Sequence, residues 1–380
     1  MRNLALSLFL GSLLFCLTGC LDEVGLASVG SAKSLGRIMF PRFIATGVHS
    51  TDASAITGQL DSKPTDNWTA VWSGYAADYA ERSAGTMESG QIDNGKYLLL
   101  KAAVYYRVAG YPYPLDEGRK AAYRKSAELF RQYIKFVDPQ PETINFSLET
   151  KRAVGYLRIP SGARRFPAAI ILPGLDSVKE EMYWLENIFL EKGFVTLTID
   201  SPGTGDNEWP LRADSQRLLN RVVEYAQAHN SIDPEKIALV GFDFGGYWAL
   251  RTAAHKRISA VAVVNAPVHY AFEGNRVGQY PRFFYNMLRQ ACGAGDHQEL
   301  YKTMNSLSLK DSLSKIDAAV LAIYPGKAML LPDEEKNLLL SELKIPVSIK
   351  TYPQEKYGLI TNLQSEVYPL LTDWLERTLR

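Results

Sequence analysis

The residues best suited to chemistry stand in the stretch Gly241-Phe242-Asp243-Phe244-Gly245. An apolar run at 237–240 precedes this stretch, and a helix-like segment begins at Tyr247. This order of strand, tight turn and helix is the pattern of a nucleophile elbow. The turn of such an elbow has a polar residue at its centre and small residues two positions before and two positions after it. Side chains at 241 and 245 would collide with the strand and the helix, which explains the two glycines. The polar residue at the centre is Asp243, where a serine hydrolase has serine.

The elements around the elbow indicate an α/β fold with a mostly parallel sheet flanked by helices. From residue 141 onward, apolar or alternating runs are separated by helical patterns, and this order is typical of βαβ units. In such sheets the loops at the carboxyl ends of the strands form the site. We therefore predict an α/β domain over 141–380, with a lid-like insertion at about 270–314. The predicted strands cover 143–148, 152–159, 168–172, 194–199, 237–240, 260–264, 319–323 and 347–350.

The chain before this domain divides into two predicted segments. Residues 21–62 are rich in small and polar side chains, so we expect a tether followed by an irregular segment. Residues 63–140 show helical spacing, as in the stripe of Trp68, Trp72 and Tyr79. This segment is predicted to form a helical cap. The aromatic stripe is expected to be core packing, with a ligand cavity as the alternative.

The first twenty residues have the pattern of a targeting signal. Arg2 is followed by an apolar stretch at 4–17 and by Leu17-Thr18-Gly19-Cys20, which resembles the lipobox of a bacterial lipoprotein. Lipidation of Cys20 would make the membrane a partner and place the protein in the cell envelope. Leu21 would favour the outer membrane in a Gram-negative host. An ordinary secretory peptide and a membrane span are the alternatives.

Composition excludes several classes of partner. The net charge is +1 with no long basic run, so nucleic-acid binding is not expected. The five histidines show no metal-ligand spacing and no phosphate-binding glycine loop is present, so no metal or cofactor is predicted. Cys292 is expected to be a small buried residue. A small ester or another apolar ligand remains the expected partner, and the sequence does not indicate the oligomeric state.

Several passages resemble the FrsA-like group of α/β-hydrolase-fold proteins. Gly174-Leu175-Asp176-Ser177 with Lys179-Glu180-Glu181 is similar to the loop of that group, and the stretch 200–205 is similar to its turn. The elbow at 241–245 and the helical stretch 97–136 are similar as well. FrsA proteins are described as esterases, and serine-bearing relatives hydrolyse esters or carbon–carbon bonds. The resemblance therefore implies an esterase-like hydrolase with a helical cap.

The residues of a conventional triad are nevertheless missing. In this fold an acid follows the nucleophile and a histidine follows the acid. After the strand at 319–323 no carboxylate occurs before Asp333, and no histidine follows His297. An aspartate nucleophile would also need a histidine to activate water, and His269 is the one candidate at the site-bearing edge. A loop histidine bonded to backbone is the alternative interpretation of His269.

The expected oxyanion hole is formed by the backbone N–H of Phe244 and by the loop Gly174-Leu175-Asp176. A carboxylate at Asp243 would be stabilised by these donors, so we expect it to ionise readily and to attack carbonyl carbons poorly. Ser177 and Ser201 lie on neighbouring loops but not on an elbow, and Lys179 and Glu181 are expected to make a loop–helix contact. Three functions stay open: ester hydrolysis by an unconventional arrangement, binding without catalysis, and hydrolysis with Asp243 as nucleophile and His269 as base.

Overall fold

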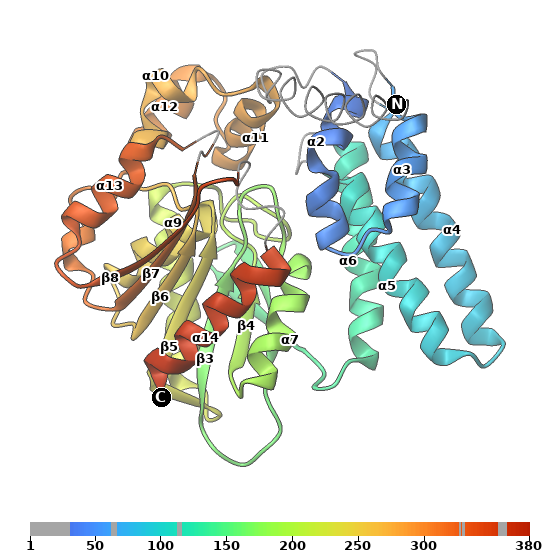
Figure 1. Ribbon diagram of the computed structural model, residues 1–380, viewed down its shortest axis with the longest axis horizontal. Coiled ribbons are helices and arrows are strands. Elements are labelled where there is room, and N and C mark those ends of the chain that lie inside the picture. Colours follow the sequence, from blue (N-terminus) through green and yellow to red (C-terminus); the bar gives the residue numbers. More distant parts are fainter. Residues whose placement is uncertain (1–30, 62–66, 112–115, 327, 329–330, 356–362) are drawn as a thin grey trace, which may run out of the picture.

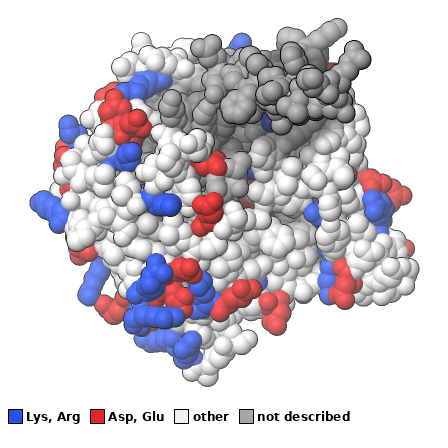
Figure 2. Space-filling model, in the orientation of Figure 1, with Lys and Arg blue, Asp and Glu red and all other residues white. Residues whose placement is uncertain are grey.

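The structure is a computed structural model, and it describes residues 31–61, 67–111, 116–326, 328, 331–355 and 363–380. A bundle of long helices from the N-terminal third lies beside a sheet covered by helices on both faces (Figure 1). Acidic and basic side chains are interspersed on the face shown in Figure 2. The predicted lipidation site, Cys20, lies outside the described residues. Within them, no helix combines the length and the apolar character needed to cross a bilayer.

The sheet has eight strands in the order β1-β2-β4-β3-β5-β6-β7-β8. β1 pairs antiparallel with β2, and β2 pairs antiparallel with β4, while every other pair is parallel. The predicted α/β fold class is therefore confirmed. The strands are β1 (Glu142–Leu148), β2 (Lys151–Arg158), β3 (Phe166–Leu172), β4 (Val195–Ile199), β5 (Ile232–Phe242), β6 (Ala260–Val264), β7 (Ala319–Pro325) and β8 (Val347–Tyr352).

Helices bury both faces of the central strands, which explains why these strands are apolar along their whole length. On one face, alternate residues of β3, β5 and β6 pack against α7 (Tyr183–Glu191) and α14 (Tyr368–Leu379). On the other face, the intervening residues pack against α8 (Gln216–Ala228) and α9 (Phe244–Ala253). The two cores fix the position of β5 and therefore the position of the elbow at its end.

The N-terminal helices form a bundle with a hydrophobic core of its own. α4 (Trp68–Glu88), α5 (Ile92–Ala109) and α6 (Glu117–Tyr133) follow one another, as the helical spacing predicts. Trp68 and Trp72 are fully buried in this core, and neither lines the cavity described below. Residues 32–59 are not an irregular segment: they form α2 (Ala32–Ala45) and α3 (Ser50–Gln59). Leu35, Met39 and Phe43 bury one side of α2 in the same core, so tertiary packing stabilises a helix of weak sequence signal.

Between β6 and β7 the chain leaves the sheet and forms a group of short helices. These are α10 (Gly274–Val277), α11 (Arg282–Cys292) and α12 (His297–Asn305). α11 is amphipathic: Met287, Leu288 and Cys292 are buried, and its first turn carries Phe283 and Phe284 toward the carboxyl edge of the sheet. After β7, α13 (Asp333–Glu342) leads to β8. The inserted helices therefore cover the edge at which β5 ends.

Candidate active site

Asp243 sits at a strained turn between β5 and α9. Its backbone angles are φ 49° and ψ −118°, a conformation that side-chain-bearing residues rarely adopt. A Cβ atom at Gly241 would lie 2.3 Å from the carbonyl oxygen of Gly245, and one at Gly245 would lie 2.0 Å from that of Leu172. These contacts confirm the steric reason for both glycines. The turn has the geometry of a nucleophile elbow, with a carboxyl group in the reacting position.

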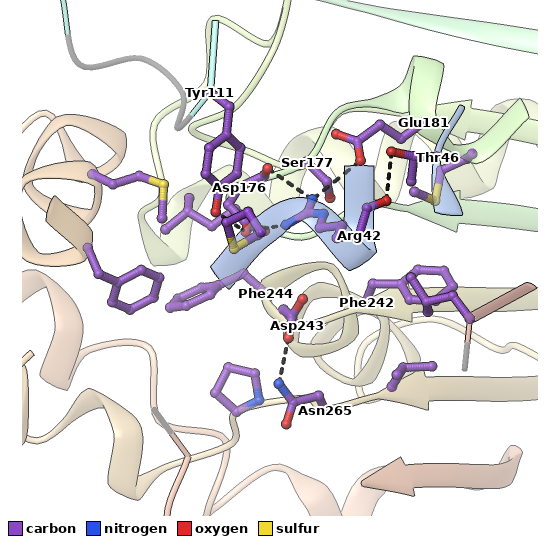
Figure 3. A pocket seen from close by; sticks show the side chains of 18 of the residues that line it. Arg42, Thr46, Tyr111, Asp176, Ser177, Glu181, Phe242, Asp243, Phe244 and Asn265 are labelled. Carbon is purple, nitrogen blue, oxygen red and sulfur yellow. Dashed lines mark hydrogen bonds and ion pairs between the residues drawn. The ribbon is translucent and has the colours of Figure 1, made fainter. Parts of the chain in front are cut away.

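A cavity of about 140 Å³ opens over Asp243 (Figure 3). Most of its wall is apolar, and four of its side chains are the phenylalanines 242, 244, 283 and 284. Polar side chains lie on both sides of the elbow. Those from the side of α2 and the loop after β3 are Arg42, Tyr111, Asp176 and Glu181, and Asn265 lies on the opposite side of Asp243. An apolar cavity of about 150 Å³ in another protein holds benzene. The size and the lining therefore fit a small, largely apolar molecule with one polar group.

The carboxyl of Asp243 faces Asn265, which directly follows β6. Nδ2 of Asn265 donates a hydrogen bond of 2.6 Å to Oδ1 of Asp243. Burial, and then the charge of Asp176, raise the pKa of Asp243 to about 7, although the hydrogen bond from Asn265 and the charge of Arg42 oppose the rise. The expectation that Asp243 ionises readily is wrong in direction. Loss of hydration outweighs the donors, so the carboxyl is largely protonated below pH 7 and becomes ionised as the pH rises through about 7.

The expected oxyanion donors surround this carboxyl. The backbone N–H groups of Leu175 and Phe244 have no acceptor among the described residues, and both residues line the cavity. Phe244 is also the first residue of α9, whose N-terminus carries positive partial charge. A Cβ atom at Gly174 would lie 3.0 Å from Oδ2 of Asp243, so the loop after β3 closely approaches the elbow. The structure thus brings together Gly174, Leu175, Asp176, Gly241, Asp243, Phe244 and Gly245, as the sequence predicts.

Arg42 of α2 fixes the loop after β3 from the side of the helical bundle. Its guanidinium donates to the carboxylate of Asp176, to the carbonyl oxygen of Asp176 at 3.1 Å and to Oε2 of Glu181 at 3.3 Å. The hydroxyl of Tyr111 donates to Asp176 as well, at 3.2 Å. Burial opposes the charge of Arg42, but Asp176 and Glu181 hold the pKa of Arg42 above its ordinary value. Arg42 is therefore a fully charged anchor with partners on two adjacent segments.

A second buried ionic cluster surrounds Lys179 and ties the loops after β3 and β4 together. Its Nζ is completely buried and lies 2.7 Å from Asp200, 3.1 Å from Glu180 and 3.1 Å from Asp206. This arrangement agrees with the predicted structural contact of Lys179. Glu181 instead faces Arg42, and Arg107 at 3.8 Å. The side chains of Lys179 and Glu181 therefore both help to hold the loop that carries Leu175 and Asp176.

The two serines that follow β3 and β4 are bonded to backbone. The hydroxyl of Ser201 is fully buried and donates to the carbonyl oxygen of Pro173 at 2.6 Å. The hydroxyl of Ser177 donates to the carbonyl oxygen of Gly174 at 3.4 Å, and Ser177 lines the cavity. Neither stands beside a histidine, so neither has a base that would make it a nucleophile.

All five histidines lie in the described part of the chain, and none of them lines the cavity. His269 follows β6 as predicted, but Nδ1 of its ring is 2.8 Å from the hydroxyl of Ser308 and Nε2 is 4.0 Å from Glu273. The structure therefore does not place His269 against Asp243. The segment 356–362, where a triad histidine would stand, lies outside the described residues, and its sequence contains no histidine.

A buried carboxylate from α13 holds the loop that carries His269. Glu335 is completely buried and accepts the backbone N–H groups of Val268, His269 and Ala271 at 2.9, 2.8 and 2.5 Å. Burial raises the pKa of Glu335, and these three hydrogen bonds oppose the rise. Glu335 comes after β7, as a triad acid would, but its partners are backbone groups. It therefore positions the loop after Asn265 rather than a catalytic base.

Arg42 and Asn265 are the two site residues that the sequence reasoning missed. Asn265 had a usable signal, because a polar residue directly after a buried strand lies at the site-bearing edge. Arg42 had none, because its segment lacks a clear pattern and reaches the site only through tertiary packing. The cavity offers no metal site: nowhere in the described ranges do three or more His, Cys, Asp or Glu side chains gather suitably.

Comparison with known proteins places these features in a family. Residues 44–380 match the family model described as Esterase FrsA-like. The chain is 29% identical over 215 residues to 2,6-dihydropseudooxynicotine hydrolase of Paenarthrobacter nicotinovorans, covering 56% of this chain and 58% of that protein. It is 27% identical over 282 residues to esterase FrsA of Vibrio cholerae, covering 70% of this chain and 65% of that protein. The chain thus matches about three fifths of the length of these relatives.

One solved structure resembles the fold over nearly its whole length. The crystal structure of 2,6-dihydroxy-pseudo-oxynicotine hydrolase superposes with a TM-score of 0.78, covering 90% of this chain and 95% of that one. The two sequences are 22% identical. At this identity the likeness establishes the architecture, with a helical region attached to an α/β-hydrolase sheet.

Proposed function

Because the chain belongs to the FrsA-like esterase family, we propose that its cavity binds a small carboxylic ester and hydrolyses it without a Ser–acid–His triad. One observation carries the proposal: a buried carboxyl with a pKa near 7, that of Asp243, occupies the nucleophile position of the elbow. A general base is most effective when its pKa lies near the working pH. The cavity also supplies two backbone N–H groups, those of Leu175 and Phe244, which have no acceptor among the described residues.

In the proposed reaction Asp243 acts on water. The ionised carboxyl takes a proton from a water molecule as the water oxygen attacks the carbonyl carbon of the ester. The N–H groups of Leu175 and Phe244 stabilise the negative charge that develops on the carbonyl oxygen. The tetrahedral intermediate then releases the alcohol, whose oxygen takes the proton from Asp243. The products are a carboxylic acid and an alcohol, and Asp243 returns to its ionised form.

Direct attack by Asp243 is less well supported than attack by water. A covalent aspartyl ester must be hydrolysed by water that a histidine activates in the aspartate-nucleophile mechanism. His269, the one predicted candidate, is bonded to Ser308 and does not line the cavity. The water route needs only the groups that are already beside the elbow.

The cavity also limits the substrate. A volume of about 140 Å³ fits a short acyl or single-ring ester. The described charged residues of its wall are Arg42 and three carboxyls, those of Asp176, Glu181 and Asp243, and Arg42 is already bonded to two of them. Like charges facing a ligand oppose its binding. We therefore expect an uncharged ester rather than an anionic one.

The test is hydrolysis of 4-nitrophenyl acetate by the purified protein and by Asp243→Asn. The amide cannot take a proton from water, so we expect kcat/KM to fall by about 100-fold or more. Asp93→Asn is the matched control, because the side chain of Asp93 is 97% exposed on the helical bundle. Activity that is equal in Asp243→Asn and in the wild type would refute a role for Asp243.

Binding without turnover is the second candidate function, and the positions of the histidines favour it. No imidazole reaches the cavity, so a ligand could occupy it without meeting a conventional base. A neutral ester that raises Tm and is recovered unchanged after prolonged incubation would support this function.

The proposed place of action is the cell envelope, with a lipid anchor on Cys20. The support is the sequence pattern alone: an apolar stretch at 4–17 that ends in Leu17-Thr18-Gly19-Cys20.

A further inference from the structure

Helix α2 contributes Met39 and one charged side chain, that of Arg42, to the wall of the cavity. We propose that Arg42 is a positioning residue of this site: its guanidinium holds the Leu175–Asp176 loop against the elbow and balances the charge of Asp176 beside Asp243. This inference rests on the proposed function of Asp243. Arg42 lies two residues before the stretch 44–380 that matches the family model.

The contacts of Arg42 act on both the backbone and the charge of the loop. One guanidinium nitrogen, Nη1, bonds the carboxylate of Asp176, and the other, Nη2, bonds the carbonyl oxygen of the same residue at 3.1 Å. A planar guanidinium fixes such a pair of acceptors in direction as well as distance. Leu175, whose N–H is an expected oxyanion donor, immediately precedes Asp176. A shift of Asp176 would therefore displace this donor from the position of the carbonyl oxygen.

The same guanidinium opposes the effect of Asp176 on Asp243. The described charged and titratable side chains around the cavity are Arg42, Tyr111, Asp176, Glu181, Asp243 and Tyr368. After burial, the negative charge of Asp176 is the next cause that raises the pKa of Asp243, whereas Arg42 lowers it. Glu181 has a second cationic neighbour, Arg107, at 3.8 Å. Loss of Arg42 would therefore leave Asp176, in particular, without its cationic partner.

Three substitutions separate the effects of charge and geometry. Arg42→Met removes the charge, so the pKa of Asp243 should rise and the acid limb of the kcat/KM profile for 4-nitrophenyl acetate should move up by about one pH unit. Asp176→Asn removes the negative charge that raises the pKa of Asp243, so the acid limb should move down by a similar amount. Arg42→Lys keeps the positive charge but loses the planar guanidinium that bonds two acceptors of Asp176 at once. Its acid limb should stay near that of the wild type, while kcat falls by up to about 100-fold because the loop is misplaced.

A readout without turnover keeps this inference separate from the proposed reaction. The carboxyl carbon of Asp243 can be titrated by NMR in protein carrying ¹³C-labelled aspartate, and the resonance is assigned by its absence in Asp243→Asn. Its midpoint should move up in Arg42→Met and down in Asp176→Asn. If the wild type hydrolyses no ester, the proposed function fails, but the titration still decides whether Arg42 and Asp176 act in opposite directions on Asp243.

A purely structural role for Arg42 gives a different pattern. Loss of packing would lower Tm in Arg42→Met without moving the midpoint of Asp243. Midpoints that move in the same direction in Arg42→Met and Asp176→Asn, or that move in neither, would overturn the inference. If Arg42→Met does not fold, Asp176→Asn and Arg42→Lys supply the same test. The first must lower the midpoint, and the second must leave it within about half a pH unit of the wild type.

Discussion

Asn265 donates a 2.6 Å hydrogen bond to Asp243, and both residues hold left-handed backbone angles, φ 55° at Asn265 and φ 49° at Asp243. The two turns follow adjacent parallel strands, β6 and β5, so the pair faces one another across the carboxyl edge of the sheet. Strained non-glycine residues persist only where the surrounding structure holds them. Two of them in direct contact beside the cavity support the assignment of this edge as the candidate active site.

The amide of Asn265 suits a partner that changes its protonation state. Its NH₂ group donates to an ionised carboxyl, and after a flip its oxygen accepts from a protonated one. Oδ1 of Asn265 is buried and has no partner among the described residues. This oxygen is therefore available to Asp243 in the step of the proposed reaction in which Asp243 carries a proton.

Replacing Asn265 should raise the pKa of Asp243, because the hydrogen bond from Asn265 lowers it. We expect the acid limb of the kcat/KM profile to move upward in both Asn265→Ala and Asn265→Gly. The two variants should differ in stability. Glycine adopts the left-handed angle without strain. The free energy of unfolding of Asn265→Gly should therefore exceed that of Asn265→Ala by about 1 kcal/mol. Equal acid limbs in wild type and both variants would contradict the role of this hydrogen bond.

The raised pKa of Asp243 also predicts a pH dependence of stability. A carboxyl whose folded-state pKa is near 7 binds its proton more tightly when folded, so its contribution is complete below the ordinary value of 3.8 and is lost as pH rises through about 7. Asp243→Asn cannot ionise. The difference in free energy of unfolding between Asp243→Asn and the wild type should therefore increase in favour of the variant from pH 4 to pH 8, by up to about 4 kcal/mol.

Urea denaturation at several pH values measures this difference. Because the wild type and the variant share their other titrating groups, those contributions largely cancel in the comparison. Asp93→Asn, which removes an exposed carboxyl from the helical bundle, is the control for the same substitution at the surface. A constant difference between Asp243→Asn and the wild type would show that the pKa of Asp243 is not raised.

The sequence was sufficient to predict the elbow and the loop beside it. A Cβ atom at Gly241 or Gly245 would lie 2.3 or 2.0 Å from a backbone oxygen, so the turn requires glycine at both positions and their spacing around Asp243 predicts it. The apolar runs predicted the central strands, because strands that are buried on both faces are made mostly of apolar residues. The loop at Leu175 and Asp176 was predicted from its resemblance to a family passage.

The remaining parts of the site depend on tertiary structure that no local pattern records. α2 is a helix because Leu35, Met39 and Phe43 pack in the core of the bundle, and only that packing brings Arg42 to Asp176. The ionisation of Asp243 was predicted in the wrong direction because sequence does not measure burial. Desolvation is the largest cause of its raised pKa and exceeds the effect of the donors that the motif implies.

Cys20 gives a prediction about localisation. If Cys20 is the lipidated residue, Cys20→Ala should lose its acyl chains, and the protein should move to the soluble fraction or remain unprocessed. Fractionation of cells with detection of labelled palmitate measures both effects. Cys292→Ala is the matched control, because Cys292 is buried in the α/β domain and should not be acylated. Equal labelling of Cys20→Ala and wild type would rule out the lipoprotein assignment.

The last prediction concerns Glu335, the carboxylate that accepts three backbone N–H groups of the loop after Asn265. In Glu335→Gln one oxygen becomes an NH₂ group, which must face an N–H donor in the same buried space. A buried donor without an acceptor costs about 1–3 kcal/mol, so we expect the free energy of unfolding to fall by at least about that amount. The loop begins next to Asn265, so kcat/KM should fall as well.

Glu334→Gln is the control, because the neighbouring side chain is half exposed and its contact with Arg276 is 3.5 Å long. Surface ion pairs of this kind contribute little to stability, so Glu334→Gln should unfold at nearly the wild-type urea concentration. Hydrogen exchange separates a local effect from a general one. Faster exchange confined to the amides of Val268, His269 and Ala271 in Glu335→Gln would place the damage in this loop. Unchanged exchange at these three amides would mean that Glu335 does not hold the loop, whatever its effect on stability.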